Sequence, residues 1–215
     1  TLGNAGISNT LYGVAYGNSI FVAVGQDGAI LTSSNGSSWT SRTSGTTNSL
    51  FGITYGNSTF VVVGASGKVL TSSDGISWTS RTSGTANGLY GVAYGSNIFF
   101  AIGSGGERIT SSNSTSWSSL SGHGAINFYG ITYGNSYFVY VCQNASIFRT
   151  SDGGNTVLQG YTYGTSNNTL GVTFGNNTFV AVGNSGTILT TSDAYTWTLR
   201  ISGTTQGLRG VAYKE

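Results

Sequence analysis

Short apolar runs alternate along the whole chain with clusters of Gly, Asn, Asp and Ser, and the pattern returns several times. The stretch YGNSIFVAVGQDG at residues 16–28 is repeated with small changes at residues 55–67, 94–106, 133–145 and 174–186. β-Branched and aromatic residues dominate the apolar positions, and no window has a sustained helical period, which favours β-strands. Gly, Asn and Asp tolerate the positive φ of tight turns, so the polar clusters predict hairpins between the strands.

A glycine within each YGVAY-like segment marks the repeat, with a spacing of 39 residues except for one interval of 41. These anchors are Gly13, Gly52, Gly91, Gly130, Gly171 and Gly210. The eighth residue after each of the first five anchors is Phe, and the twenty-second is Asp or Asn. Each unit predicts four short strands, which in the first unit are LYGVAY at 11–16, IFVAVG at 20–25, AILTSS at 29–34 and SWTSRTS at 38–44.

A four-stranded sheet of this length cannot bury both of its faces alone. Radial stacking of such sheets covers the faces and leaves only short edges, which is the architecture of a β-propeller. We therefore predict an all-β fold: a five-bladed β-propeller of four-stranded antiparallel blades, with about 39 residues per blade, as a single domain over residues 1–215. The predicted repeats are 11–49, 50–88, 89–127, 128–168 and 169–207.

A sixth copy of the first strand, LRGVAY, is one strand more than five blades need. Its residues are Leu208, Arg209, Gly210, Val211, Ala212 and Tyr213. An unpaired apolar strand presents open backbone N–H and C=O groups to other chains. Three alternatives follow. The extra strand packs on an edge or rim of its own chain, it docks on a neighbouring subunit and builds an oligomer or filament, or the chain is a piece of a longer propeller.

The turn between the third and fourth strands carries a family resemblance. TSDGGNTV at 150–157 resembles the Asp box, the S/T-x-D-x-G-x-T-W hairpin of sialidase-type (BNR-like) propellers, and the other copies are one residue shorter. The whole unit resembles the repeats of bacterial and phage surface propellers and of the photosystem II assembly-factor type. The resemblance implies a structural turn, in which Asp74, Asp152 and Asp193 accept backbone N–H bonds and the aromatic residue packs beneath. The Trp residues at this place are Trp39, Trp78, Trp117 and Trp197.

Composition argues against several functions. Only 7% of residues are charged and the formal net charge is +2, so we expect no nucleic-acid partner. No apolar run approaches the roughly 18 residues of a membrane span. Ser, Thr and Asn are abundant beside one Cys and no Pro or Met, which is typical of a secreted or surface-displayed protein, such as a component of a virion or an appendage.

Candidate chemistry is equally sparse, and we predict neither an enzyme nor a cofactor or metal site. The chain has six acidic residues and one His, and His123 and Cys142 have no partners of their kind at metal-ligand spacing. Sialidase chemistry would need a cluster of arginines. Arg42, Arg81 and Arg200 instead recur at one place of the repeat, so we expect them to spread around the rim.

Binding has more candidates. Amide side chains that precede the anchors, together with aromatic residues beside the anchors, suit the hydroxyls and the apolar face of a sugar ring. The overall build is similar to that of tachylectin-type lectins, which implies glycan binding between blades. A structural role is the alternative, with the amides in Asx-turns and the aromatics in blade-to-blade contacts. The candidate ligand-binding residues are Asn9, Asn48, Asn87, Asn167, Tyr12, Phe51, Tyr90 and Tyr129.

The unit from Ser104 to Gln159 departs most from the repeat, through Glu107, Arg108, His123, Cys142, Gln143 and Arg149. It is either a distinct functional sector or a region of relaxed constraint. Two functions remain. The chain is a non-catalytic recognition or adhesion module that binds glycans or surface polymers weakly and multivalently, or it is a structural protomer that assembles with copies of itself into a filament or layer through its extra strand.

Overall fold

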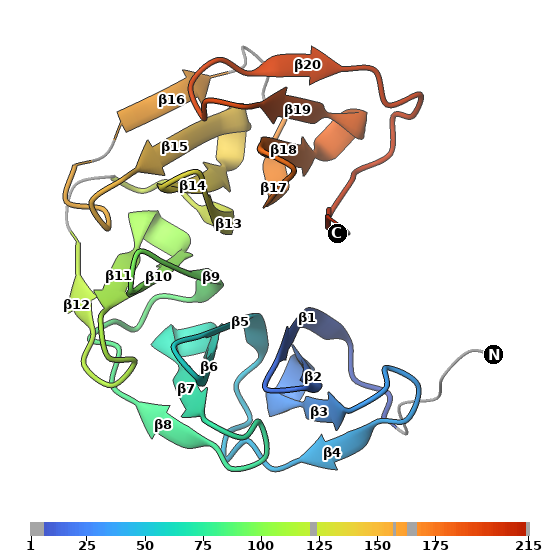
Figure 1. Cartoon of the computed structure of the whole chain (residues 1–215), viewed down its shortest axis with the longest axis vertical. Helices are drawn as coiled ribbons and strands as arrows, with labels where there is room; N and C mark the ends of the chain where they lie inside the picture. The colour runs from blue at the N-terminus through green and yellow to red at the C-terminus, as the bar shows by residue number, and fades with distance from the viewer. Residues whose placement is uncertain (1–6, 121–123, 157, 163–166, 214–215) are drawn as a thin grey trace. The chain divides into compact units, whose positions relative to one another are not determined.

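The computed structural model describes residues 7–120, 124–156, 158–162 and 167–213. Within these residues the chain forms twenty β-strands in five four-stranded sheets, each of which we call a blade (Figure 1). In every blade, strands that follow one another along the chain are hydrogen-bonded neighbours. The predicted fold class, with five four-stranded antiparallel blades, is confirmed.

Each blade occupies one of the predicted repeats. Blade 1 contains β1 (Leu11–Gly17), β2 (Ile20–Gly25), β3 (Ile30–Ser33) and β4 (Thr40–Arg42). Blade 2 contains β5 (Leu50–Gly56), β6 (Thr59–Gly64), β7 (Val69–Ser72) and β8 (Thr79–Arg81). Blade 3 contains β9 (Leu89–Gly95), β10 (Ile98–Gly103), β11 (Arg108–Ser111) and β12 (Ser118–Ser119). Blade 4 contains β13 (Phe128–Gly134), β14 (Tyr137–Cys142), β15 (Ser146–Thr150) and β16 (Leu158–Thr162). Blade 5 contains β17 (Thr169–Gly175), β18 (Thr178–Gly183), β19 (Ile188–Thr191) and β20 (Thr198–Arg200).

The first hairpin of each blade is a two-residue turn. In blade 1, Gly17 pairs with Ile20, and the intervening Asn18 and Ser19 have φ angles of 46° and 62°. Two positive φ angles in succession give the type I′ turn, whose twist matches that of the flanking strands. The GNS and GNN sequences at this place therefore meet a backbone requirement, because Asn tolerates the left-handed region better than other non-glycine residues.

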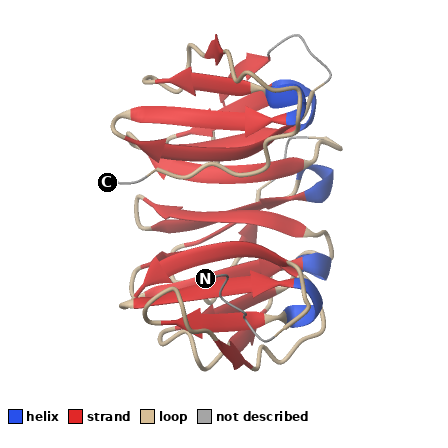
Figure 2. Cartoon of the chain, turned by 90° about the vertical axis from the view of Figure 1, so that its right-hand side faces the viewer, coloured by secondary structure: helices blue, strands red, loops and turns tan. Residues whose placement is uncertain are grey.

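The second connection is a short 3₁₀ turn, at the same end of the strands in each blade (Figure 2). In blade 1 this turn is η1 (Gln26–Gly28), and its equivalents are η2 (Ala65–Gly67), η3 (Ser104–Gly106), η4 (Gln143–Ala145) and η5 (Asn184–Gly186). Gly28 has a φ of 74°, and a Cβ there would lie 2.0 Å from the carbonyl oxygen of Thr46. Glycine thus lets the turn lie directly against the loop that follows the outer strand.

The outer strands are shorter than predicted. The prediction for blade 1 ran from 38 to 44, whereas β4 spans only Thr40–Arg42. At its end the Ser44 hydroxyl accepts a hydrogen bond from the Thr46 backbone N–H at 3.4 Å and donates to the Thr46 carbonyl at 3.1 Å. A side chain that binds its own backbone in this way competes with the sheet ladder and ends the strand.

The chain divides into two compact units, residues 1–101 with 109–119, and residues 102–108 with 120–215. In the first unit, β1 packs against β5 and β5 against β9; in the second, β13 packs against β17. One contact recurs at each of these places. A Cβ at Gly17 or Gly56 would lie 2.1 Å from the ring of Tyr55 or Tyr94, respectively. We call this the ring–glycine contact, and Gly134 with Phe174 repeats it in the second unit.

The hydrophobic core lies between neighbouring blades. Val22 and Val24 of β2 pack with Leu50 and Val62 of blade 2, and all four side chains are fully buried. Equivalent clusters join blades 2 and 3 and blades 4 and 5. The prediction that neighbouring blades bury each other's faces is confirmed at these three places, because each cluster contains side chains from two blades.

The extra copy of the first strand, residues 208–213, forms no strand. It lies against β17 at the place that the next blade's first strand would occupy. A Cβ at Gly175 would lie 2.0 Å from the Tyr213 ring, and one at Gly171 would lie 3.0 Å from the Arg209 carbonyl oxygen. The Leu208 N–H donates to the Gly183 carbonyl at 2.9 Å. A first strand is paired by the hairpin that follows it, and no such partner is present for this copy among the described residues.

Candidate functional site

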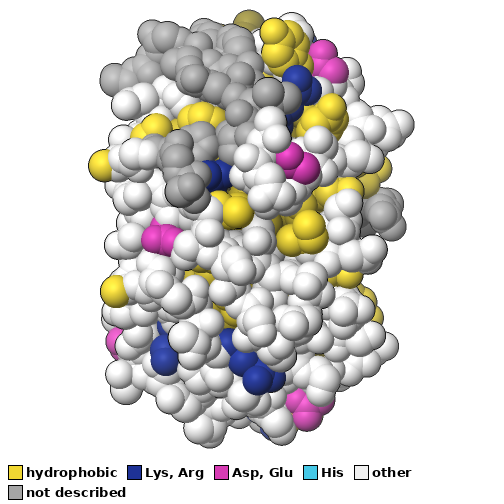
Figure 3. Space-filling model, turned by 90° about the vertical axis from the view of Figure 1, so that its left-hand side faces the viewer, with side chains coloured by type: hydrophobic (Ala, Val, Ile, Leu, Met, Phe, Trp, Pro, Cys, Tyr) yellow, Lys and Arg dark blue, Asp and Glu magenta, His cyan; other side chains and the backbone are white. Residues whose placement is uncertain are grey.

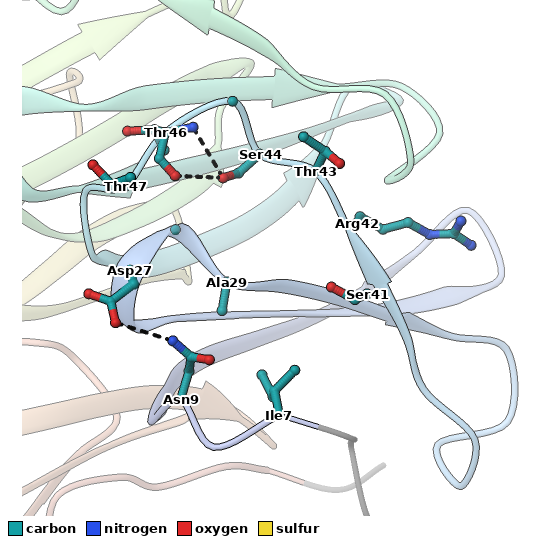
Figure 4. Close-up of a pocket in the computed structure, with 12 residues that line it drawn as sticks. Ile7, Asn9, Asp27, Ala29, Ser41, Arg42, Thr43, Ser44, Thr46 and Thr47 are labelled. Carbon is teal, nitrogen blue, oxygen red and sulfur yellow. Dashed lines mark hydrogen bonds between the residues drawn. The ribbon is translucent and has the colours of Figure 1, made fainter.

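A hollow recurs beside the outer strand of blades 1, 2 and 5, with volumes of about 690, 440 and 670 Å³. We call it the outer-strand pocket (Figure 4). Its shared lining is the turn glycine and the residue after it, the outer strand, and a Ser-Gly-Thr triplet. In blade 1 these residues are Gly28, Ala29, Ser41, Arg42, Thr43, Ser44, Gly45 and Thr46.

Local sequence builds this pocket in the same way each time. The triplet recurs at 44–46, 83–85 and 202–204, and in each copy the serine hydroxyl binds the threonine two residues on. The central glycines Gly45, Gly84 and Gly203 have φ angles of 74°, 82° and 73°, with nothing within 4 Å of a Cβ. The triplet is therefore a rigid turn with an open outer side. Periodicity does not indicate this turn, because the predicted fourth strand of blade 1 runs to Ser44, the first residue of the triplet.

Three of the predicted asparagines are hydrogen-bonded to the short 3₁₀ turn, and two of these line the pocket. Asn9 donates to the Gln26 carbonyl at 3.2 Å and to the Asp27 carboxylate at 3.3 Å (Figure 4). Asn48 donates to the Ala65 carbonyl at 3.0 Å, and Asn167 accepts from the Ser185 hydroxyl at 3.3 Å. Asn9 and Asn167 line the pockets of blades 1 and 5, while the backbone N–H of Asn87 donates to the Thr85 hydroxyl at 3.1 Å.

The predicted aromatic residues lie elsewhere. The ring centroids of Tyr12 and Phe51 are 5.5 Å apart, and those of Phe51 and Tyr90 are 5.4 Å apart, so these rings contact one another from blade to blade. Tyr129 occupies the same position in β13. Tyr12 lines a separate apolar hollow with Val14 and Trp39. The structure does not bring the predicted amides and aromatics into one pocket, and sugar binding by these eight residues stays a prediction.

The charged side chains of the repeat have structural partners. Arg42, Arg81 and Arg200 each donate from Nε to the threonine hydroxyl on the neighbouring strand at 2.9 Å. Arg42 extends away from Asn9 and Asp27 in Figure 4. Charged groups are also scattered over the face drawn in Figure 3, where uncharged surface dominates. Hydroxyl-bearing residues and glycines are common in the lining of the outer-strand pocket in blades 1 and 2, whereas blade 5 has Leu199 and Ile201 in the places of Ser41 and Thr43.

The aspartates of the third turn accept backbone N–H bonds as expected. The Asp74 carboxylate accepts from Ile76 and Ser77 at 2.8 Å. These bonds, with that of the Ser72 hydroxyl, lower the pKa of Asp74 to about 2. The pKa of Asp152 and of Asp193 is lowered to about 2 by the same kind of bonds. Asn35 takes the same role in blade 1, accepting from Ser37 and Ser38 at 2.9 and 3.0 Å.

The divergent unit places its unusual residues in contacts inside the second compact unit. Arg108 is 1% exposed and donates to the Gly154 carbonyl at 3.2 Å. The Arg149 guanidinium lies 5.0 Å from the Tyr137 ring and 4.9 Å from the Tyr195 ring. Glu107 follows η3, and its N–H donates to the Ser104 carbonyl at 3.2 Å; the Gln143 N–H donates to the Asn127 carbonyl at the same distance.

Groups suited to acid–base or metal chemistry do not gather in the described part of the chain, where no three His, Cys, Asp or Glu side chains could hold one metal ion. Burial raises the pKa of the Cys142 thiol to about 12, and the thiol donates to the Ser146 carbonyl at 3.1 Å. Burial also raises the pKa of Tyr140. His123 lies outside the described residues.

The five blades define the chain as a β-propeller, and solved propellers resemble it over most of its length. YCF48 bound to a D1 peptide matches with a TM-score of 0.71 at 16% identity, over 91% of this chain and 67% of that chain. The computationally designed Ika8 protein matches with 0.74 at 15% identity, over 96% and 66%. YCF48 from Cyanidioschyzon merolae matches with 0.69 at 14% identity, over 93% and 74%.

This chain therefore spans 66% to 74% of the length of those three structures. At such low identity the likeness shows the fold alone. No protein-family model and no curated protein matches the chain. None of the helices among the described residues is long and apolar enough to cross a membrane.

Proposed function

We propose that the chain is a non-catalytic recognition module that binds glycans or other hydroxyl-rich surface polymers weakly, at several equivalent pockets. The observation that carries this proposal is the recurrence of the outer-strand pocket in blades 1, 2 and 5. A weak site gains avidity when several copies engage one polymer, by about 10²–10⁴ without any new contact.

The chemistry of the pocket supports a hydroxyl-rich ligand. Ser41 and Thr43 are exposed on the outer strand of blade 1, and Ser80 and Thr82 repeat them in blade 2. Hydroxyls both donate and accept hydrogen bonds, as sugar hydroxyls do. The rigid triplet turn adds backbone groups at a fixed position. A shallow pocket with such a lining favours orientation of a sugar over tight enclosure.

The proposal includes an extracellular or surface-displayed location, which the low charge and the Ser, Thr and Asn content support. It includes no enzyme activity, cofactor or resident metal. The resemblance to Asp-box propellers and to tachylectin-type lectins supports an adhesive role. YCF48 is solved with a D1 peptide, so a protein ligand is an outcome that the experiment has to distinguish.

A glycan array followed by affinity measurement tests the proposal. The test variant removes pocket hydroxyls in two blades, by Ser41→Ala with Thr43→Val and Ser80→Ala with Thr82→Val. The matched control, Thr40→Val with Thr79→Val, changes the neighbouring residues of the same strands, whose side chains point to the other face. We expect the test variant to lose at least about tenfold in affinity for an immobilised glycan, and the control to bind as the unaltered chain does. An array without a hit, or equal losses in both variants, would contradict the proposal.

A second candidate is a structural protomer that assembles into an extracellular filament or layer through residues Leu208–Tyr213. The observation in its favour is that this segment lies on β17, while within the second compact unit a Cβ at Gly210 would have nothing within 4 Å. Electron microscopy of the purified chain tests it. Deletion of residues 206–215 should leave a folded propeller without polymers, and unchanged polymers would refute it.

A further inference from the structure

A hollow of another kind lies between blades 1 and 2, inside the first compact unit. Its volume is about 300 Å³, at the lower end of the range of about 300–1,000 Å³ that is usual for ligand pockets. Ile20 belongs to its wall in blade 1, and Asp74 and Ile76 belong to its wall in blade 2. Thr32 and Arg42 also line it. We call this hollow the inter-blade groove.

Contacts beside the inter-blade groove hold its two walls in place. The Asn18 side chain donates to the Ser73 carbonyl at 3.4 Å, which ties the first hairpin of blade 1 to blade 2. A Cβ at Gly75 would lie 2.7 Å from Ile20 Cδ1, so the third turn of blade 2 lies directly against blade 1. A ligand therefore meets walls that are already in position, which reduces the entropy lost on binding.

The groove carries one positive and one negative side chain with bonding capacity to spare. Arg42 donates from Nε to a threonine hydroxyl on β3 at 2.9 Å, which orients the guanidinium and leaves its Nη groups as donors. Asp74 accepts at Oδ1 from the Ser72 hydroxyl and from the N–H groups of Ile76 and Ser77, which leaves the lone pairs of Oδ2 for a ligand. Arg42 and Asp74 are both described residues, and they form no ion pair with each other within 4.0 Å.

Blades 4 and 5 show how the chain fills the equivalent place in the second compact unit. There Arg149 stands at the repeat position of Thr32. Its guanidinium lies 5.0 Å from the Tyr137 ring and 4.9 Å from the Tyr195 ring, which stand at the repeat positions of the two isoleucines. Nη1 donates to the Asp193 carbonyl at 3.2 Å. A planar polar group thus fits between these positions, and the shorter threonine of blade 1 leaves a hollow there.

We propose that the inter-blade groove binds one hexopyranose unit of a glycan. The inference rests on the proposed recognition of glycans and adds to it a site separate from the outer-strand pocket. Ile20 and Ile76 offer apolar surface to the C–H groups of the ring. Arg42 supplies donors and Asp74 supplies acceptors, and sugar hydroxyls bond to both because they accept and donate. A charged ligand would meet one like charge in this pair, which favours a neutral ring.

An NMR titration of the ¹⁵N-labelled chain tests the site. The probes are the methyl glycosides of glucose, galactose, mannose and N-acetylglucosamine. We expect at least one of them to shift the backbone amide signals of Ile76 and Ser77 and the Nε–H signal of Arg42. The amide signals of Tyr195 and Thr196, in the equivalent turn of blade 5, should stay in place and are the internal control.

Two matched pairs of variants identify the contacts. Asp74→Asn should weaken binding of that glycoside at least about tenfold, because it removes the charge from one hydrogen bond. The turn itself persists, since Asn35 accepts the same backbone bonds in blade 1. Asp193→Asn makes the same change in blade 5 and should not alter binding. Arg42→Lys should also weaken binding, because lysine lacks the oriented fork, and Arg81→Lys at the same place in blade 2 is its control.

Equal losses in a variant and its control, or shifts that avoid Ile76 and Ser77, overturn the inference. It also fails if a pool of neutral peptides shifts these signals and no glycoside does, because the ligand is then a protein. If the array gives hits that the outer-strand test variant weakens, and the groove signals stay in place, the groove is the wrong site and the proposed function stands. If a glycoside binds the groove and the outer-strand test variant binds as the parent chain does, the groove is upheld and the outer-strand site fails. If no glycan binds, both fail.

Discussion

The ring–glycine contact gives a sharp prediction for Gly56, which lies beneath Tyr94. A Cβ at Gly56 would lie 2.1 Å from Cγ and 2.2 Å from Cδ1 of Tyr94, whereas ordinary contacts begin at 3.4 Å. Gly56 does not have a positive φ, so its backbone accepts alanine. Gly56→Ala therefore forces the Tyr94 ring away from blade 2, and overpacking of this kind costs about 1–3 kcal/mol.

Thermal unfolding measures this cost. For a chain of this length, 1 kcal/mol corresponds to a shift of about 2–4 °C, so we expect the melting temperature to fall by about 2–12 °C. Gly207→Ala is the matched control, since the nearest atom to a Cβ there is Asn184 Oδ1 at 3.5 Å. It should be neutral or slightly stabilising, because alanine lowers the entropy of the unfolded chain.

A double-mutant cycle identifies the cause. Tyr94→Ala removes the ring, so Gly56→Ala should cost much less in that background than in the parent chain. If Gly56→Ala is equally costly with and without the ring, the cost comes from the backbone and our account of the contact is wrong. Our account of the contact is also wrong if Gly56→Ala and the Gly207→Ala control have the same melting temperature.

Three further predictions concern the turns and the buried thiol. The pKa of Asp74, Asp152 and Asp193 is lowered from 3.8 to about 2, so their stabilising effect is complete above pH 3.8 and is lost as the pH falls towards 2. The melting temperature should fall over that range, and less so in a triple Asp→Asn variant, because Asn35 already accepts the same bonds in blade 1. Cys142 should resist thiol reagents at pH 8 until the chain unfolds, because burial raises its pKa to about 12. Labelling of the folded chain as fast as an exposed thiol is labelled would contradict this. Asn48→Ala should destabilise the chain by about 1 kcal/mol, as it removes the bond to the Ala65 carbonyl; weaker glycan binding without loss of stability would instead support the sequence-based site.

Much of the fold could be predicted from the spacing of the repeats and from the residues that tight turns require. The GNS turns predict hairpins because two successive residues need positive φ, and Asn18 and Ser19 have it. The eighth-residue Phe, as in Phe60, is fully buried. Such features are local or repeat with a fixed period, so a single sequence carries them. The hydrogen bonds of the turn between the third and fourth strands could also be predicted from the sequence, since Asp74 accepts them from residues only two and three positions away.

The outer-strand pocket was harder to predict from the sequence, because it joins segments that are distant along the chain. Gly28 and Thr46 meet only once the 3₁₀ turn folds onto the loop after the outer strand. The contacts of the divergent unit are also long-range. Arg108 stands where the other blades have Ile or Val, such as Ile30, and it is buried against Gly154. A sequence shows that such a residue is unusual but not what surrounds it.

The ring–glycine contact also restricts the symmetry of anything built from these blades. One side of a first strand carries rings and the other carries the glycines that receive them, as β5 does with Tyr55 and Gly56. Two identical sides cannot satisfy each other, because ring would meet ring or glycine would meet glycine. A pair that joins two like sides, ring side to ring side or glycine side to glycine side, is therefore excluded. Only a head-to-tail order works, and it ends either in a closed cycle or in an open fibre.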